Sequence, residues 1–273
     1  MTRAYIARVT RLRWLLAVLV VAGLCLAAFA TYQRVTANPG CDVGIRCVRV
    51  LFLGNSYTSV NDLPDTLARL AWSGGHRMEI AAQAPGGWTL GDHLSSHDTA
   101  RLLNGTRWDY VVIQEQSEIP SVESFRQSEM YPAVRGLVTM IRRAGATPLL
   151  FVTWAHRAGW PQNGMRDYAS MQAAIDDGYR AIAAELHVAM APVGPAWLQM
   201  VAQESSPGLW QDDGSHPTGS GTYLAACVLY AAIFGQSPAG LGWHPWIWGG
   251  DADRLQRTAA ATVLDDRPEW GLP

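Results

Sequence analysis

The strongest constraint in this sequence is the regular alternation, after residue 47, of short apolar runs with longer segments of helical periodicity. The apolar runs lie at 48–53, 78–82, 109–113, 147–153 and 188–193. Helix-like segments at 62–73, 123–144 and 167–186 separate them, with a looser stretch at 90–103. Strands joined by helices of this length form right-handed βαβ units. Residues 48–273 are therefore expected to form one three-layer α/β domain with a mainly parallel, five-stranded sheet.

Two further helices are expected near the C-terminus, at 218–235 and 251–264, on either side of an irregular stretch rich in Trp and Gly at 240–250. In open parallel sheets, ligands bind beyond the carboxyl ends of the strands. Functional residues are therefore to be sought directly after each apolar run.

The N-terminal segment predicts export of the rest of the chain. Residues 14–30 carry no charge, and four arginines precede them without any acidic residue: Arg3, Arg8, Arg11 and Arg13. The basic end of such a segment stays on the cytoplasmic side of a membrane. Two interpretations of residues 1–32 remain open: a hydrophobic helix that anchors the protein in the membrane, or a signal peptide cleaved after Ala28-Phe29-Ala30, near Ala30. Both predict an extracytoplasmic domain.

A polar linker at residues 33–47 contains two cysteines, Cys41 and Cys47, at a separation of six positions. Such a pair can close a small disulfide loop in an oxidising compartment, and no neighbouring Cys or His pair completes a zinc site. Cys227 lies in an apolar helical stretch and is expected to be a buried, unreactive thiol. The cysteines therefore favour a disulfide over a metal.

The charge balance argues against nucleic acid as a partner. All 21 basic residues are Arg, and four of them lie before residue 14. The chain after residue 30 holds 17 basic and 23 acidic residues, a net charge of −6. A domain of this sign repels a phosphate backbone.

The first apolar run is followed by Gly54-Asn55-Ser56-Tyr57-Thr58 at a strand-to-helix junction. A Ser two residues after a Gly can occupy a tight turn with its hydroxyl exposed, as in the G-x-S-x-G nucleophile elbow, but Thr58 replaces the second Gly of that motif. A Ser at such a junction also commonly caps the helix. Taken alone, the motif leaves nucleophile and helix cap as alternatives.

A second polar motif, Asp213-Gly214-Ser215-His216-Pro217, lies near the C-terminus. An acid three residues before a His can orient the ring through Nδ1–H and leave the other nitrogen free to accept a serine proton. A turn that caps the helix after Pro217 would explain Asp213 and leave His216 unexplained. Asp212 is the alternative acid, although the spacing favours Asp213.

Two more motifs follow the second and third apolar runs: Pro85-Gly86-Gly87-Trp88 and Gln114-Glu115-Gln116-Ser117. A Gly offers an unhindered backbone N–H and a Gln offers a side-chain N–H, so with the Ser56 N–H they would form an oxyanion hole. Each motif alone is better explained as a plain turn. Their order, each directly after a successive strand, favours the oxyanion hole.

Together the four motifs resemble those of the SGNH (GDSL-type) hydrolase superfamily, in that superfamily's order over residues 48 to about 235. The resemblance implies a flavodoxin-like α/β/α fold with Ser56 as nucleophile and with His216 and Asp213 completing a catalytic triad. It also makes Ser56 and Gly87 oxyanion donors, with Gly87 fitting better than its neighbour because an x-Thr follows it. Asn55 departs from the pattern, in which Asp is usual.

The third motif departs further, because the superfamily commonly has Gly-x-Asn-Asp where this chain has Val-Val-Ile-Gln-Glu-Gln-Ser. It resembles the branch of carbohydrate O-acetylesterases that includes sialate O-acetylesterase-like proteins, in which the Gln of a Gln-Gly-Glu segment replaces that Asn. By its position after the strand, Gln114 is the expected third donor, with Gln116 as the alternative.

The implied reaction is hydrolysis of an ester through an acylated Ser56, with no metal or other cofactor. His93 and His97 are four residues apart, but their segment lacks the Glu of H-E-x-x-H, so a solvated helix face is expected there. An O-acyltransferase with the same triad and a non-catalytic glycan-binding protein are the alternative functions.

The expected substrate is an O-acyl ester, in particular an O-acetyl ester, of a carbohydrate or similar small molecule. The chain has 12 Trp, and aromatic rings can stack on sugar faces, although large aromatics mostly serve core packing. Residues that follow strands near the proposed site are expected to bind the substrate: Trp88, Gln116, Trp154 and His156.

Overall fold

The computed structural model describes residue 41 and residues 47–245 and 247–273. The segment 1–32, with its expected hydrophobic helix, and most of the linker lie outside the described residues. Cys41 and Cys47 are joined by the expected disulfide, with their Cα atoms 5.4 Å apart. Within the described ranges, no helix combines the length and the apolar character that crossing a bilayer requires.

Five parallel strands form one sheet in the order β2-β1-β3-β4-β5, the order of flavodoxin-like folds. The strands are β1 (Val48–Leu53), β2 (Met78–Gln83), β3 (Tyr110–Ile113), β4 (Thr147–Phe151) and β5 (Ala189–Ala191). Leu53 of β1 pairs with Gln83 on one side and with Ile113 on the other, so these three strands end at the same level. The switch point of the sheet lies between β1 and β3, where the loops after these strands border the expected ligand crevice.

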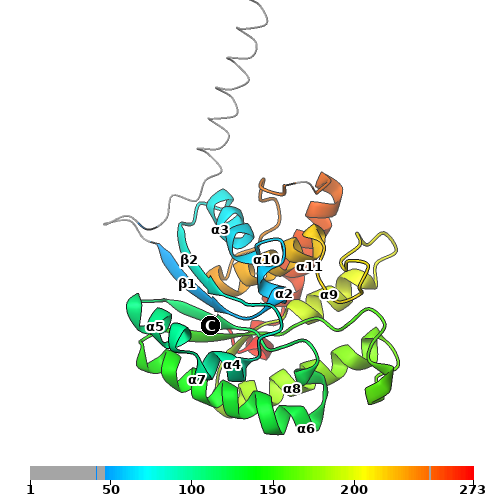
Figure 1. Cartoon of the computed structure of the whole chain (residues 1–273). Helices are drawn as coiled ribbons and strands as arrows, with labels where there is room; N and C mark the ends of the chain where they lie inside the picture. Colours follow the sequence, from blue (N-terminus) through cyan, green and yellow to red (C-terminus); the bar gives the residue numbers. More distant parts are fainter. Residues whose placement is uncertain (1–40, 42–46, 246) are drawn as a thin grey trace, which may run out of the picture. The chain divides into compact units, whose positions relative to one another are not determined.

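Helices cover both faces of the sheet, as Figure 1 shows. One layer holds α3 (Leu63–Ser73), α9 (Val193–Val201), α10 (Gly219–Phe234) and α11 (Gly249–Leu264). The other holds α4 (Leu90–Ser95), α5 (His97–Gly105), α7 (Tyr131–Arg143) and α8 (Tyr168–Leu186). Burial from both sides explains why the inner strands β1, β3 and β4 are largely apolar runs, whereas the edge strand β2 is only partly buried. The predicted α/β class, the three layers and the five-stranded parallel sheet are confirmed.

The departures from the predicted elements have local causes. The stretch at 90–103 forms two helices because Ser96 adopts an extended conformation and its hydroxyl caps α5. The helix predicted at 123–144 consists of α6 (Glu123–Phe125), a π-helical turn at Arg126–Met130, and α7. The run at 188–193 gives a shorter strand because Pro192 follows β5 directly and caps α9, a helix that the sequence pattern missed.

Candidate active site

The turn after β1 presents Ser56 as the first residue of the short helix α2 (Ser56–Ser59). A glycine is needed at position 54, since a Cβ there would lie 2.5 Å from Thr58 Oγ1 and 2.6 Å from Gln114 Oε1. Asn55 caps α2, because its side-chain oxygen accepts from the Tyr57 N–H at 3.1 Å. The capping role that the sequence left open therefore belongs to Asn55, and the Ser56 hydroxyl takes part in a different contact.

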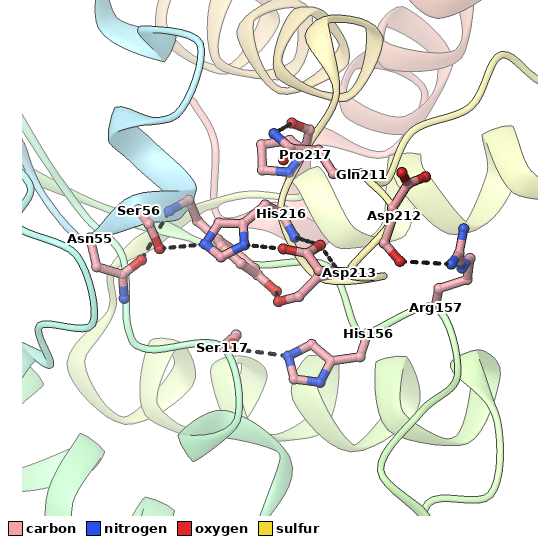
Figure 2. Close-up of polar contacts among 12 residues, drawn as sticks. Asn55, Ser56, Ser117, His156, Arg157, Gln211, Asp212, Asp213, His216 and Pro217 are labelled. Carbon is pink, nitrogen blue, oxygen red and sulfur yellow. Dashed lines mark hydrogen bonds and ion pairs between the residues drawn. The ribbon is translucent and has the colours of Figure 1, made fainter.

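Ser56, His216 and Asp213 form a hydrogen-bonded chain, which Figure 2 shows. His216 Nε2 lies 2.9 Å from Ser56 Oγ, and His216 Nδ1 lies 2.6 Å from Asp213 Oδ2. The hydrogen bond from the Ser215 N–H, followed by those from His216, lowers the pKa of Asp213 to about 2. A charged Asp213 favours the tautomer with the proton on Nδ1, which leaves Nε2 to accept from the Ser56 hydroxyl.

Asp213 is the acid that contacts His216, whereas Asp212 contacts Arg157 through its backbone. The backbone oxygen of Asp212 accepts from Nη2 of Arg157 at 3.3 Å. The backbone N–H of Arg157 also donates to the Gly214 oxygen at 2.8 Å. These two contacts fasten the loop after β4 to the loop that carries His216.

A stack of three buried aromatic rings supports the loop that carries His216. Tyr57 lies over Trp154 with 4.3 Å between ring centroids, and Trp154 lies over Trp197 at 4.2 Å. The Tyr57 hydroxyl is 2.7 Å from Ser215 Oγ, and Trp154 Nε1 donates to the Ser215 oxygen at 2.9 Å. Trp154 is fully buried between its two ring neighbours. The prediction that Trp154 binds substrate is therefore wrong, and its role is to hold the loop.

The loop after β2 brings Gly87 next to the Ser56 turn. Gly87 has a φ of 77°, a conformation that favours glycine. The backbone oxygen of Trp88 accepts from Asn55 Nδ2 at 2.9 Å, which ties this loop to the Ser56 turn. The backbone N–H groups of Ser56 and Gly87 have no acceptor within the part of the chain that the structure describes. Both are therefore free to donate to a ligand.

Gln114 is buried, and both hydrogens of its amide are engaged. Its Nε2 donates to Asn55 Oδ1 at 3.0 Å and to the Glu115 oxygen at 2.6 Å. Its Oε1 accepts from the Asn55 N–H at 3.0 Å and from the Thr58 hydroxyl at 2.9 Å. The prediction that Gln114 donates to an oxyanion is therefore wrong, because its side chain is committed to holding the Ser56 turn.

Gln116 keeps an amide hydrogen available. Its Oε1 accepts from the backbone N–H groups of Glu118 and Ile119 at 2.8 and 3.3 Å, which fixes the side chain. Its Nε2 has only a long contact within the described residues, 3.4 Å to Ser117 Oγ. Of the two glutamines after β3, Gln116 is the one whose geometry leaves a donor for a ligand.

His156 and Ser117 lie beside the chain of Ser56, His216 and Asp213 (Figure 2). His156 follows β4, is partly exposed, and its Nε2 lies 3.2 Å from Ser117 Oγ. Burial lowers the pKa of His156, so its ring is neutral at neutral pH. The predicted substrate-binding His156 therefore borders the site with a neutral imidazole.

His93 and His97 lie on different helices, at the end of α4 and the start of α5. His93 is fully buried, and its Nε2 donates to the Gly54 oxygen at 2.8 Å. Burial lowers the pKa of His93, which makes it a neutral support for the turn before Ser56. The predicted solvated face is therefore wrong for His93, while His97 is exposed. No group of His, Cys, Asp and Glu within the described ranges is arranged to hold a metal ion.

Two residues of this region, Asn55 and Glu115, are not expected from the sequence to belong to the site. In the sequence Asn55 is only a departure from a motif, yet in the structure it contacts the loops after β2 and β3. Glu115 is fully buried although it is an acid. Its position between two glutamines, directly after a buried strand, was the one signal that could have identified it.

Comparison with solved structures relates this arrangement to known proteins. A protein from Slackia heliotrinireducens that is assigned to the SGNH hydrolases is 30% identical, over 68% of this chain and 98% of its own, with a TM-score of 0.57. A DUF4886 family protein from Bacteroides uniformis is 20% identical, over 81% of this chain and 96% of its own, with a TM-score of 0.69. A mutant of an acetyl-xylooligosaccharide esterase from Geobacillus is 16% identical, over 78% of this chain and all of its own, with a TM-score of 0.50.

No protein-family model matches the sequence, and no curated protein matches it either. The Bacteroides and Geobacillus proteins share the fold, at identities of 20% and 16%. The Slackia protein is similar in sequence as well, over almost its whole length. The chain therefore belongs to the SGNH hydrolase superfamily and has the fold of an ester hydrolase.

Proposed function

We propose that this protein is a serine esterase in which Ser56, His216 and Asp213 form a catalytic triad. The observation that carries the proposal is the hydrogen-bonded chain through these residues, with spacings of 2.9 Å from Ser56 Oγ to His216 Nε2 and 2.6 Å from His216 Nδ1 to Asp213 Oδ2. At such spacings a base can take a serine proton while an acid orients the base.

The reaction begins when His216 Nε2 removes the Ser56 proton and Ser56 Oγ attacks the acyl carbon. Asp213 remains charged and stabilises the protonated ring. The backbone N–H groups of Ser56 and Gly87 and the amide of Gln116 hold the oxyanion. His216 then gives its proton to the leaving alcohol, and a water activated by the same ring releases the acid and restores Ser56.

Gln116→Ala is expected to lower kcat by about 10²–10³-fold, the scale of a single oxyanion donor. KM for a small aryl ester should change little, because the donor acts on charge that develops in the transition state. Gln114→Ala is the comparison variant, and it should lower the melting temperature as well as kcat, because it removes the buried hydrogen bonds to Asn55 and Thr58 that hold the Ser56 turn. Steady-state kinetics and thermal unfolding of both variants check this. Normal turnover in Gln116→Ala would contradict the assignment.

For the substrate we propose an O-acetyl ester of a carbohydrate. The likeness in fold to an acetyl-xylooligosaccharide esterase supports this class. Trp88 supports it too, since it is partly exposed and its ring packs against His93 in a T-shaped arrangement, with 5.0 Å between centroids. An aromatic ring offers a stacking surface to a sugar, and the neutral His156 can exchange hydrogen bonds with a sugar hydroxyl.

Acetyl release from an acetylated xylo-oligosaccharide and from an aryl acetate, with and without a glycan acceptor, tests the substrate class. We expect a higher kcat/KM for the sugar ester, with free acetate as the product. His156→Ala should raise KM for the sugar ester by about 3–10-fold, the scale of one hydrogen bond, and affect the aryl acetate less. Transfer of the acetyl group to the acceptor would indicate an O-acyltransferase instead, and equal effects on both esters would argue against sugar recognition by His156.

We also propose that the reaction takes place outside the cytoplasm. The disulfide between Cys41 and Cys47 supports an oxidising compartment. The uncharged segment at 14–30 behind four arginines supports export.

A further inference from the structure

The carboxyl group of Glu115 joins the loops that follow β2 and β3, the two strands on either side of β1. Glu115 lies two residues after β3 and is 0% exposed. Its Oε1 accepts from the Leu90 N–H at 3.0 Å and from the Gln116 N–H at 2.7 Å. Its Oε2 is buried and has no hydrogen-bond partner among the described residues. A single oxygen atom therefore bridges the loop after β2 and the loop after β3.

Both bridged segments carry a proposed oxyanion donor. Leu90 is the first residue of α4 and follows Gly87 by three positions. Thr89 and Asp92 form a capping box at the start of this helix. The hydrogen bond from the Leu90 N–H to Glu115 therefore also restrains the turn before the helix. Gln116 is held at its own backbone N–H, next to the side chain that offers the amide donor.

We propose that Glu115 is a positioning residue of the oxyanion hole, whose carboxyl group sets the spacing between the Gly87 and Gln116 donors. This inference rests on the proposed function, because it assumes that these two groups hold the oxyanion. Asn55 links the Ser56 turn to the Gly87 loop at the Trp88 oxygen. Glu115 adds the link between the Gly87 loop and Gln116, so all three donor segments are tied to one another.

The hydrogen bonds from the Leu90 and Gln116 N–H groups to Glu115 Oε1 can form in either protonation state of the carboxyl group. Burial raises the pKa of Glu115 to about 7, against the lowering effect of the two backbone N–H groups of Gln116 and Leu90. The carboxylates of Glu129 and Asp92 raise it further, and the Tyr179 hydroxyl accepts from the Glu115 backbone N–H at 3.3 Å. Since Oε1 can accept from both N–H groups whether or not Oε2 carries a proton, the proposal requires an acceptor at this position and does not require the charge.

The test compares Glu115→Gln, which keeps the acceptor oxygen, with Glu115→Ala, which removes it. Glu115→Ala should lower kcat for an aryl acetate by about 10–100-fold, because small displacements of catalytic groups have effects of this size. KM should change by less than about threefold, since the donors act in the transition state. Glu115→Gln should keep kcat within about threefold of the wild type, as expected for a retained acceptor.

Gln256→Ala is the matched control, because it also removes a buried side-chain oxygen that accepts a backbone hydrogen bond. Gln256 is 2% exposed on α11, and its Oε1 accepts from the Gly240 N–H at 2.9 Å, in a part of the domain that contributes nothing to the proposed site. Glu115→Ala and Gln256→Ala should both lower the melting temperature, but only Glu115→Ala should lower kcat per folded enzyme. Glu115→Asp, whose carboxylate is one methylene shorter, replaces Glu115→Ala if the latter does not fold, and it should lower kcat relative to Glu115→Gln.

The outcomes separate this inference from the proposed function. In one outcome the wild type is active while Glu115→Ala, or Glu115→Asp where that variant is used, has a normal kcat. This result overturns the positioning role and leaves the esterase assignment intact. A loss in Glu115→Gln as large as that in Glu115→Ala also overturns it, because the acceptor alone would then be insufficient. A folded wild type that hydrolyses no ester and is not labelled at Ser56 overturns both.

Discussion

Replacing Ser56 by Ala is expected to lower kcat for an aryl acetate by about 10⁶-fold while the protein stays folded, a loss on the scale that other serine hydrolases show for their nucleophile. Without the hydroxyl, no acyl-enzyme forms, and only the oxyanion donors and substrate binding still favour attack by water. The Ser56 side chain is partly exposed and contacts His216 Nε2 at 2.9 Å, so its removal leaves the core packing intact. Kinetics, circular dichroism and labelling with a serine-directed fluorophosphonate measure the effect.

Ser117→Ala is the matched control for this prediction, because Ser117 also contacts an imidazole. Ser117 Oγ lies 3.2 Å from His156 Nε2, but Ser117 is only 8% exposed. No carboxylate among the described residues is hydrogen-bonded to the His156 ring, whereas Asp213 orients His216 at 2.6 Å. We expect the label on Ser56 in the wild type and in Ser117→Ala. A label on Ser117, or activity that survives in Ser56→Ala, would contradict the assignment.

The sheet could be predicted because its inner strands are buried and therefore appear as continuous apolar runs, such as Tyr110–Ile113. Gly and polar residues follow the ends of β1, β2 and β3, so the position of ligand sites in parallel sheets indicates Ser56, Gly87 and the glutamines after β3. His216 follows no strand. Its spacing from Asp213 indicates its role, and this spacing is a local feature that sequence alone can show.

The direction of individual side chains could not be predicted in the same way. Gln114 and Gln116 are the same residue type two positions apart, and the choice between them depends on Asn55, which is 59 positions from Gln114 in the sequence. Trp154 follows a strand, as a substrate-binding residue would, but two rings distant in sequence, Tyr57 and Trp197, enclose it. These contacts are made only once the chain has folded, so no local pattern encodes them.

The two departures from the superfamily's motifs are connected in the structure. Asn55 stands where Asp is usual, and its Nδ2 donates to the Trp88 oxygen, which a carboxylate could not do. Its Oδ1 accepts from Gln114 Nε2 at 3.0 Å, so the amide at position 55 and the amide at position 114 complete one network. The unusual residue in the first motif and the unusual residue in the third therefore serve the same purpose, which is to fix the Ser56 turn.

His216→Ala should also lower kcat by about 10⁶-fold, since the base and the nucleophile of a triad act as a unit. The two variants differ in what remains. His216→Ala keeps the Ser56 hydroxyl, so added imidazole should restore part of the activity, which it cannot do in Ser56→Ala. Asp213→Asn should lower kcat by about 10⁴-fold, because an amide at that position no longer holds the proton on His216 Nδ1. Rates with and without imidazole, measured for all three variants, distinguish these roles.

His97→Ala is the control for loss of an imidazole, because His97 is exposed on α5 and takes no part in the hydrogen-bonded chain. It should leave kcat unchanged. A folded His216→Ala variant that keeps more than about 1% of wild-type kcat would contradict a general base at this position, because a base within hydrogen-bonding distance of the nucleophile contributes far more than that. The separation of 160 positions between Ser56 and His216 makes this result informative about the fold as well, since their contact exists only if the loop before α10 lies against the turn after β1.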